Sequence, residues 1–306
     1  MSEPKETRRQ AGQAAPADVQ PTIARREVTN RILKAFHLRA DKSLGQNFLV
    51  EESVVARIAA AAELTPADKV LEIGPGIGTL TQALARTGAQ VTSVELDQRL
   101  LPVLAETVGC YANVRIVHGD ILKTDIPALL GGDSFKVAAN LPYYITTPII
   151  MHLLEQGLPL ERLVVMVQKE VAERMTAAPG SRAYGAISVA MQYYTEPRLA
   201  FVVKAGSFLP APKVDSAVLV CRRHTAPPVA VPDEKVFFRV VAAAFSVRRK
   251  MLTNSLRHMG GLSGDQVKAW LAAAGIDGTR RAETLSLEEF AALARAFGPI
   301  GAAREP

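Results

Sequence analysis

The tetrapeptide Asn140-Leu141-Pro142-Tyr143 holds groups that suit chemistry on a nucleobase. The Asn140 side-chain oxygen and the Leu141 carbonyl can each accept one hydrogen of an adenine amine. This pairing favours a tetrahedral nitrogen whose lone pair, otherwise delocalised into the ring, points at a methyl donor. Pro142 stiffens the turn, and Tyr143 can stack on a flipped base. Such a site works by positioning and electrostatics, without a nucleophilic side chain; a turn that only packs a tyrosine is the structural alternative.

A glycine-rich turn earlier in the chain indicates a nucleoside site. The run from Glu72 to Gly78 follows a predicted strand and opens a helix, and Gly74 and Gly76 let the backbone approach a bound nucleoside closely. Thr79 stands where a dinucleotide fingerprint requires its last glycine. The turn therefore fits a nucleoside without a pyrophosphate better than a nicotinamide cofactor. A glycine turn that merely joins strand to helix is the structural alternative.

Two acids follow later strands. Glu95 ends the second strand, roughly 20 residues after the glycine turn, where an acid can accept hydrogen bonds from both hydroxyls of a ribose. Asp120 follows the third strand, so its carboxylate can accept from the amine of a cofactor adenine while Ile121 covers the ring. A surface acid at Glu95 and a helix cap at Asp120 are the structural alternatives. Capping and strand-end solvation account for Asp97 and His118, to which we assign no role.

A basic stretch lies farther along the chain. Between Lys235 and Gly264 there are six lysines and arginines and no acid, and the densest part is Arg248-Arg249-Lys250. Clusters of this kind neutralise phosphates, and they make RNA affinity sensitive to salt. We therefore predict that Arg248, Arg249 and Lys250 bind RNA. A solvated helix face is the structural alternative.

The elements that must position these groups alternate between short apolar strands and helices from Lys69 onward. This alternation predicts βαβ units and a mostly parallel sheet, on which ligands bind at the carboxyl ends of the strands. Strands are predicted over residues 70–73, 91–95, 114–117, 136–139 and 163–167. Helices are predicted over residues 29–37, 53–62, 79–86 and 98–107, and residues 41–50 are expected to be irregular.

The pattern changes near Arg198. Residues 199–204 and 217–221 are β-rich, with a Pro-rich link and no clear helix between them, which favours an antiparallel pair at the sheet edge. A linker follows over residues 224–232, and helices are predicted over 233–258, 264–274 and 286–297. The predicted fold is therefore α/β, Rossmann-like, with an antiparallel edge hairpin and a small all-helical domain at the C-terminus.

Bulk properties narrow the class of protein. The hydrophobic fraction of 48% suits a globular chain, and no apolar run approaches the roughly 20 residues that span a bilayer. The N-terminus lacks a secretory leader, so we expect a cytoplasmic protein without membrane association. Residues 1–20 hold few large apolar groups and are predicted to be a disordered tail. The net charge of +6 favours a polyanionic partner.

The two cysteines, Cys110 and Cys221, are expected to be thiols that serve in packing. No Cys/His cluster has zinc spacing, so we expect no metal.

Six sequence blocks in order resemble the KsgA family of ribosomal RNA adenine dimethyltransferases, from about Lys42 to the C-terminus. The blocks are Leu44-Gly45-Gln46-Asn47-Phe48-Leu49, Glu72-Ile73-Gly74-Pro75-Gly76, Val94-Glu95-Leu96-Asp97, Gly119-Asp120, Asn140-Leu141-Pro142-Tyr143, and the run from Phe208 to Ser216. The resemblance implies a Rossmann-like methyltransferase sheet that binds S-adenosylmethionine, followed by a helical RNA-binding domain. The expected divisions are 1–20, 21–225 and 226–306.

The resemblance also implies roles that the residue types alone do not suggest. Asn47 and Leu49 would border the cofactor together with Asn140, and Phe208 would face Tyr143 across the target adenine. The implied product is a pair of adjacent dimethyladenosines in a hairpin near the 3′ end of 16S ribosomal RNA, within an immature small ribosomal subunit. We expect a monomer, because a large RNA must reach the open face.

Three other functions stay open at this point. A related family methylates large-subunit ribosomal RNA and confers antibiotic resistance; it shares the same motifs, and the extended C-terminal helical part argues against it. A DNA adenine methyltransferase would need a target-recognition domain, which the sequence does not suggest. A ribosome-assembly factor, in which binding matters more than methylation, is compatible with an intact active site.

Overall fold

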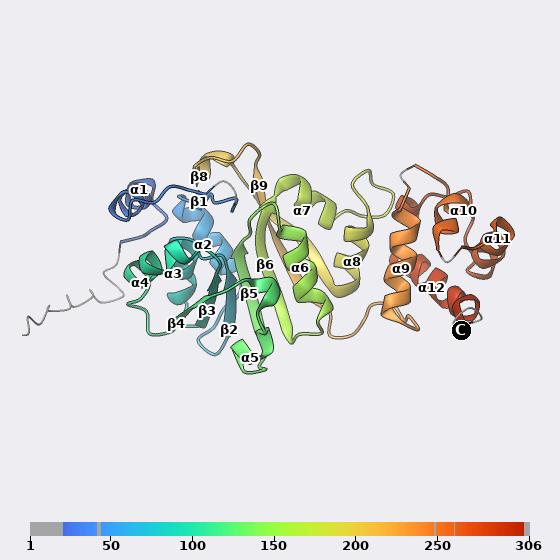
Figure 1. Cartoon of the computed structure of the whole chain (residues 1–306), viewed down its shortest axis with the longest axis horizontal. Coiled ribbons are helices and arrows are strands. Elements are labelled where there is room, and N and C mark those ends of the chain that lie inside the picture. Colours follow the sequence, from blue (N-terminus) through green and yellow to red (C-terminus); the bar gives the residue numbers. More distant parts are fainter. Residues whose placement is uncertain (1–20, 42–43, 248, 260, 303–306) are drawn as a thin grey trace, which may run out of the picture.

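The computed structural model describes residues 21–41, 44–247, 249–259 and 261–302. The predicted disordered tail, residues 1–20, lies outside the described residues, and so does Arg248. A sheet flanked by helices forms the larger part of the molecule, and the last helices gather at one end of it (Figure 1).

The central sheet has seven strands in the order β4-β3-β2-β5-β6-β9-β7. The parallel strands are β2 (Lys69–Ile73), β3 (Gln90–Glu95), β4 (Val114–His118), β5 (Phe135–Asn140) and β6 (Leu160–Gln168). Strand β9 (Ser216–Arg223) runs antiparallel to β6 and to the edge strand β7 (Thr195–Val203). The predicted α/β sheet and its antiparallel edge pair are confirmed. The strand order reverses between β2 and β5, where the carboxyl ends of such strands open a crevice for ligands.

Helices cover both faces because the inner strands are apolar on both sides. In β6, Val164 and Met166 pack against one helical layer and Leu163 and Val165 against the other, and all four are fully buried. The first layer contains α2 (Glu52–Ala61) and α3 (Thr79–Ala85). The second contains α5 (Ile126–Leu130), α6 (Thr146–Glu155), α7 (Lys169–Met175) and α8 (Ala186–Tyr194). Helices α1 (Arg26–Ala35) and α4 (Leu101–Thr107) share a third apolar cluster.

A second, two-stranded sheet joins distant parts of the chain. Strand β1 (Phe48–Leu49) pairs antiparallel with β8 (Phe208–Leu209), in the register Phe48↔Leu209 and Leu49↔Phe208. The sequence predicted an irregular segment over residues 41–50, and this short strand contradicts the last part of that prediction. A strand of two residues has no periodic signal, because its partner lies far along the chain. The pairing sets Asn47 and Leu49 beside the ends of β2 and β5.

The C-terminal helices are α9 (Glu234–Phe245), α10 (Leu252–Ser255), α11 (Gly264–Ala273) and α12 (Leu287–Ala302). The single helix predicted over residues 233–258 is wrong, because α9 ends at Phe245. Arg249 has a positive φ of 62°, and the Leu252 amide donates to the Arg280 carbonyl at 2.8 Å instead of continuing the helix. This turn lets Leu252 and Leu256 reach the buried core.

The C-terminal helices pack on α8 rather than standing apart from the sheet. Phe237 of α9 stacks on Tyr193 with ring centroids 4.9 Å apart, and one continuous apolar cluster runs from the sheet into these helices. Among the described residues, no helix has the length and apolar character that a membrane crossing requires.

Candidate active site

A cavity opens at the carboxyl ends of β2, β3 and β5, where the parallel order places the predicted ligand site. Its walls include the predicted residues Asn47, Leu49, Gly74, Gly76, Glu95, Asn140, Leu141, Pro142 and Tyr143. The glycine turn, the acid of β3, the loop after β5 and the segment before β1 are distant in sequence. The fold therefore brings four separate motifs together around one volume.

The glycine turn forms the floor of the cavity in a conformation that side chains disfavour. Gly74 and Gly76 have φ of +68° and +61°, in the left-handed region that glycine adopts without strain. No atom lies within 4 Å of the point where a side chain on Gly74 would begin. The space beside the Gly74 backbone is therefore open to a ligand.

Glu95 stands at the end of β3 and is almost wholly buried, with 5% of its surface exposed. One carboxylate oxygen accepts from the Gly76 amide at 3.1 Å and the other from the Asp97 amide at 2.8 Å. Burial raises the pKa of Glu95, while these two backbone hydrogen bonds favour its ionised form. Each oxygen keeps a lone pair that can accept from a ligand hydroxyl.

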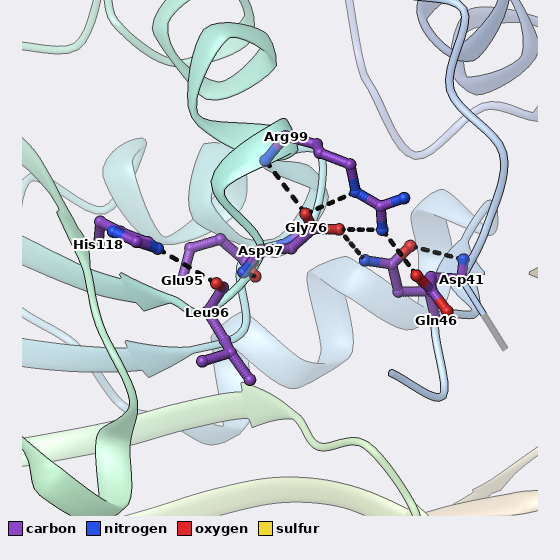
Figure 2. Close-up of polar contacts among 8 residues, drawn as sticks. All are labelled: Asp41, Gln46, Gly76, Glu95, Leu96, Asp97, Arg99 and His118. Carbon is purple, nitrogen blue, oxygen red and sulfur yellow. Dashed lines mark hydrogen bonds and ion pairs between the residues drawn. The ribbon is translucent and has the colours of Figure 1, made fainter. Parts of the chain in front are cut away.

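Asp97 anchors the loop before β1 to the end of β3 (Figure 2). Its carboxylate accepts from the Gln46 amide at 2.8 Å and from the Arg99 guanidinium at 2.8 and 2.7 Å. Arg99 also donates to Asp41 at 2.9 Å, and its hydrogen bonds lower the pKa of Asp97. Asp97 caps the short 3-10 helix Gln98–Leu100, which confirms the capping interpretation. Asp97 also holds Gln46 at the wall of the cavity, a role that no local sequence pattern indicates.

The loop after β5 presents two free acceptors. The Asn140 amide nitrogen donates to the Asn47 carbonyl at 3.3 Å, and the Leu141 amide donates to the Met166 carbonyl at 3.1 Å. No donor of the described residues reaches Asn140 Oδ1 or the Leu141 carbonyl oxygen. Two unpartnered acceptors on consecutive residues match the two hydrogens of an amine.

Tyr143 is fixed by its own hydroxyl, which shares a hydrogen bond of 2.6 Å with the Ser216 hydroxyl at the start of β9. Burial raises the pKa of Tyr143, so the phenol stays neutral.

Phe208 does not line the cavity: the residue is 1% exposed and packs in the apolar cluster that contains Leu49. Its stacking role stays a prediction, and stacking on an adenine would require this ring to become accessible.

Asp120 and Ile121 also do not line the cavity. Asp120 caps the 3-10 helix Ile121–Lys123 by accepting from the Leu122 amide at 3.1 Å, so the capping alternative is realised. Ile121 is buried in the core on the opposite face of the sheet from α2 and α3. Their contact with a cofactor adenine stays a prediction.

Thr79 is a wall residue that the sequence did not predict. It begins α3, and its hydroxyl is buried without a hydrogen-bond partner in the described part of the chain. Its position could have identified it as a site residue, because Thr79 stands where a dinucleotide fingerprint has its last glycine. A buried hydroxyl left unsatisfied costs about 1–3 kcal/mol, which a polar ligand atom would offset.

Glu72 lies beneath the glycine turn and is completely buried. One of its oxygens accepts from Thr81 at 2.7 Å and from Ser93 at 2.6 Å, which joins β2, β3 and α3. Burial raises the pKa of Glu72 to about 7. This carboxyl supports the turn from below and does not line the cavity.

Comparison with known proteins assigns the chain to a family. The model of the ribosomal RNA adenine dimethylases matches residues 37–297. The chain belongs to this family. A relative from Geobacillus thermodenitrificans named ribosomal RNA small subunit methyltransferase A is 47% identical over 280 residues, covering 89% of this chain and 96% of its own length. One of the same name from Enterococcus faecalis is 48% identical, covering 90% and 96%.

Solved structures agree with the family's fold. The 23S rRNA methyltransferase ErmE matches with a TM-score of 0.65 and 30% identity, over 82% of this chain and 99% of that one. A dimethyladenosine transferase from Plasmodium falciparum matches with a TM-score of 0.69 and 24% identity, over 83% and 98%. The dimethylase is thus an enzyme that transfers methyl groups from S-adenosylmethionine to adenines of ribosomal RNA.

The cavity fits this methyl donor. When bound, S-adenosylmethionine supplies a methyl group on a positively charged sulfur. Glu95 offers carboxylate lone pairs for ribose hydroxyls, Thr79 offers an unsatisfied hydroxyl, and the bare backbone of Gly74 leaves space for a ligand. These features are what a nucleoside with a polar tail requires.

Proposed function

We propose that this dimethylase acts on small-subunit RNA, and that it dimethylates two adjacent adenosines in a hairpin near the 3′ end of 16S ribosomal RNA. The substrate would be an immature small ribosomal subunit in the cytoplasm. The relatives from Geobacillus and Enterococcus carry small-subunit names at 47% and 48% identity, whereas ErmE, which is named for 23S RNA, is 30% identical. The greater similarity supports the small-subunit assignment over the large-subunit alternative.

The observation that carries the chemical part of the proposal is the pair of free acceptors at Asn140 and Leu141. Each accepts one hydrogen of the target amine, so that the lone pair of the nitrogen turns toward the sulfonium methyl group. The carbon–nitrogen bond would form as the sulfur–methyl bond breaks and its electron pair stays on sulfur, leaving a neutral thioether. The Asn140 and Leu141 oxygens would stabilise the positive nitrogen until it loses a proton to solvent. Pro142 keeps the loop rigid, and Tyr143 stacks on the flipped adenine, with Phe208 on its other side.

The remaining wall residues hold the cofactor in this proposal. Glu95 would accept from the ribose hydroxyls, Gly74 and Gly76 would let the backbone approach the bound nucleoside, and Asn47 and Leu49 would border the cofactor. Asp120 would accept from the adenine amine of the cofactor, and Ile121 would cover the ring. The Thr79 hydroxyl bonds a polar atom of the cofactor.

RNA binding is assigned to the C-terminal helical part, residues 226–306, and the methyl transfer to residues 21–225. Arg249 and Lys250 are exposed in the turn between α9 and α10, and neither has a hydrogen-bond or ion-pair partner among the described residues. Unpaired cations at a turn are free to meet phosphates. Arg248 is assigned with them from sequence. We also propose that the protein acts as a monomer and without a metal ion.

The test is to map methylated adenines by mass spectrometry after the protein and S-adenosylmethionine are incubated with unmethylated small subunits, and with large subunits in parallel. Two neighbouring dimethyladenosines near the 3′ end of 16S RNA are expected. Methylation confined to large-subunit RNA would overturn the proposal in favour of the resistance-type activity. Absence of methylation, with subunit maturation still supported, would favour an assembly factor.

A further inference from the structure

Exposed apolar side chains gather beside the catalytic residues. Tyr144 is 56% exposed and follows Tyr143, and Val214 is 45% exposed and stands two residues before Ser216, the partner of Tyr143. Single exposed apolar side chains are common on protein surfaces. Tyr144, however, directly follows Tyr143, which lines the cavity, so a ligand that extends from the cavity past Tyr143 can cover the exposed Tyr144 ring.

The Tyr144 ring lies beside Gly45, in the loop before β1. A side-chain carbon on Gly45 would stand 3.4 Å from Tyr144 Cδ1, 3.7 Å from Tyr144 Cε1 and 3.6 Å from Pro142 Cβ. These are ordinary van der Waals distances, so the Tyr144 ring and Pro142 lie beside Gly45, and it is the φ of +63° that favours glycine at this position. No described residue bonds the Tyr144 hydroxyl.

The two consecutive tyrosines have opposite environments. The Tyr143 hydroxyl is bound to Ser216, and Tyr143 lines the cavity. Tyr144 lies outside the cavity at the tip of the same turn, with most of its ring in solvent. Because neighbouring Cα atoms are only about 3.8 Å apart, the nucleotide next to one held at Tyr143 is within reach of the Tyr144 ring.

We propose that the Tyr144 ring is a second nucleobase subsite, on which the base adjacent to the target adenosine stacks. This inference rests on the proposed function, because it requires an unpaired RNA strand at the mouth of the cavity. Protein aromatic rings stack on unpaired bases whatever their sequence. With two adjacent adenosines as substrate, Tyr144 holds the second while the first is methylated, and so sets the register between them.

The alternative is that Tyr144 only clamps the loop that contains Gly45. The two roles differ in their effect on the cofactor. A clamp would support S-adenosylmethionine binding in the absence of RNA, because Gly45 and its neighbours line the cavity. A base platform would leave that binding unchanged and would act only when RNA is present.

The experiment compares the parent with Tyr144→Ala and Tyr144→Phe, and with Val202→Ala as the control. Val202 is a similarly exposed apolar residue on the edge strand β7 and does not line the cavity. The probe is an RNA hairpin in which fluorescent 2-aminopurine replaces the base beside the target adenosine. Stacking on the Tyr144 ring should quench its fluorescence for the parent, Tyr144→Phe and Val202→Ala, and the quenching should be lost with Tyr144→Ala.

Kinetics provide the second readout, with unmethylated small subunits as substrate. Tyr144→Ala should raise the KM for the subunit about tenfold, as expected for one lost base stack, and should lower the fraction of molecules dimethylated at both adenosines. Its calorimetric Kd for S-adenosylmethionine should equal that of the parent. Tyr144→Phe should restore both RNA readouts, because it keeps the ring.

The outcomes separate this inference from the proposed function. If the parent methylates the two adenosines but Tyr144→Ala shows unchanged quenching and KM, the subsite is refuted and the proposed function stands. A weakened cofactor Kd with unchanged quenching identifies Tyr144 as a loop clamp. If the parent methylates no adenine of small-subunit RNA, the proposed function fails, and the subsite fails with it.

Discussion

Replacing Asn140 by alanine tests the catalytic assignment most directly, because the side chain has two roles that contribute different free energies. In the proposed mechanism its oxygen accepts from the target amine, and in the structure its nitrogen donates to the Asn47 carbonyl at 3.3 Å. The oxygen matters most as the amine nitrogen becomes tetrahedral, so its loss falls on the transition state. Removing one preorganised partner of this kind costs about 2.7–4 kcal/mol, or roughly a hundred- to a thousandfold in rate.

The hydrogen bond from the Asn140 nitrogen to Asn47 determines how much the same substitution should weaken cofactor binding. A neutral hydrogen bond contributes about 0.5–1.5 kcal/mol, so loss of the contact with Asn47 should weaken cofactor binding by roughly tenfold at most. The measurements are single-turnover transfer of labelled methyl groups, calorimetric titration of the cofactor and RNA binding. The transfer rate of Asn140→Ala should fall by at least an order of magnitude more than cofactor affinity, and RNA binding should survive.

Asn113→Ala is the matched control. Its amide donates to the Ala85 and Ala89 carbonyls at 2.8 Å, and Asn113 precedes β4, at the end of the sheet opposite the cavity. This variant should lose stability without slowing transfer at a temperature where it stays folded. A near-parental rate for Asn140→Ala, or equal losses in rate and in cofactor affinity, would refute the catalytic role of the Asn140 oxygen.

Three further predictions follow from the same site and its surroundings. Glu95→Ala should weaken S-adenosylmethionine binding by about 1.5–3 kcal/mol for each ribose hydrogen bond lost, less what water restores, and an unchanged calorimetric Kd would remove Glu95 from the site. Arg248→Ala combined with Arg249→Ala should flatten the log–log salt dependence of RNA binding by about 0.7–0.9 per phosphate contact and spare cofactor affinity; an unchanged slope would leave the segment a solvated surface. The Glu72 carboxyl has a folded-state pKa of about 7 against 4.5 in the unfolded chain, so the parent should lose stability as pH rises through this window, whereas Glu72→Gln should not. Urea unfolding at about pH 5 and about pH 8 should show the variant gaining about 3 kcal/mol on the parent, and parallel pH profiles would contradict the buried-acid argument.

The sequence by itself determined the parts of this protein whose signals are local. The strands were predictable because short apolar runs such as residues 163–167 alternate with helical segments, and βαβ order implies a parallel sheet. Knowing that parallel strands end at one edge was enough to place Gly74, Glu95 and Asn140 together, and the structure lines one cavity with all three. The fold class, and the edge of the sheet at which a ligand binds, therefore follow from the periodicity of apolar residues and the order of strands and helices along the chain.

The helix prediction over residues 233–258 failed for a reason that local signals do not contain. No proline or glycine interrupts this stretch, so its pattern reads as one helix. The chain nevertheless turns after Phe245, because Leu252 bonds to Arg280 and its side chain is buried in the core. Burial against a distant segment outweighed helix propensity.

Only the tertiary structure decided how the walls of the cavity are fixed. The β1–β8 pairing brings Leu49 opposite Phe208, and Asp97 and Arg99 hold Gln46 and Asp41 at the end of β3. The same packing buries the Phe208 ring, which family resemblance alone would place at the target base. These contacts join residues that are distant in the chain. Their free energy depends on which surfaces the completed fold brings into contact, and a pattern within a few residues carries no information about that.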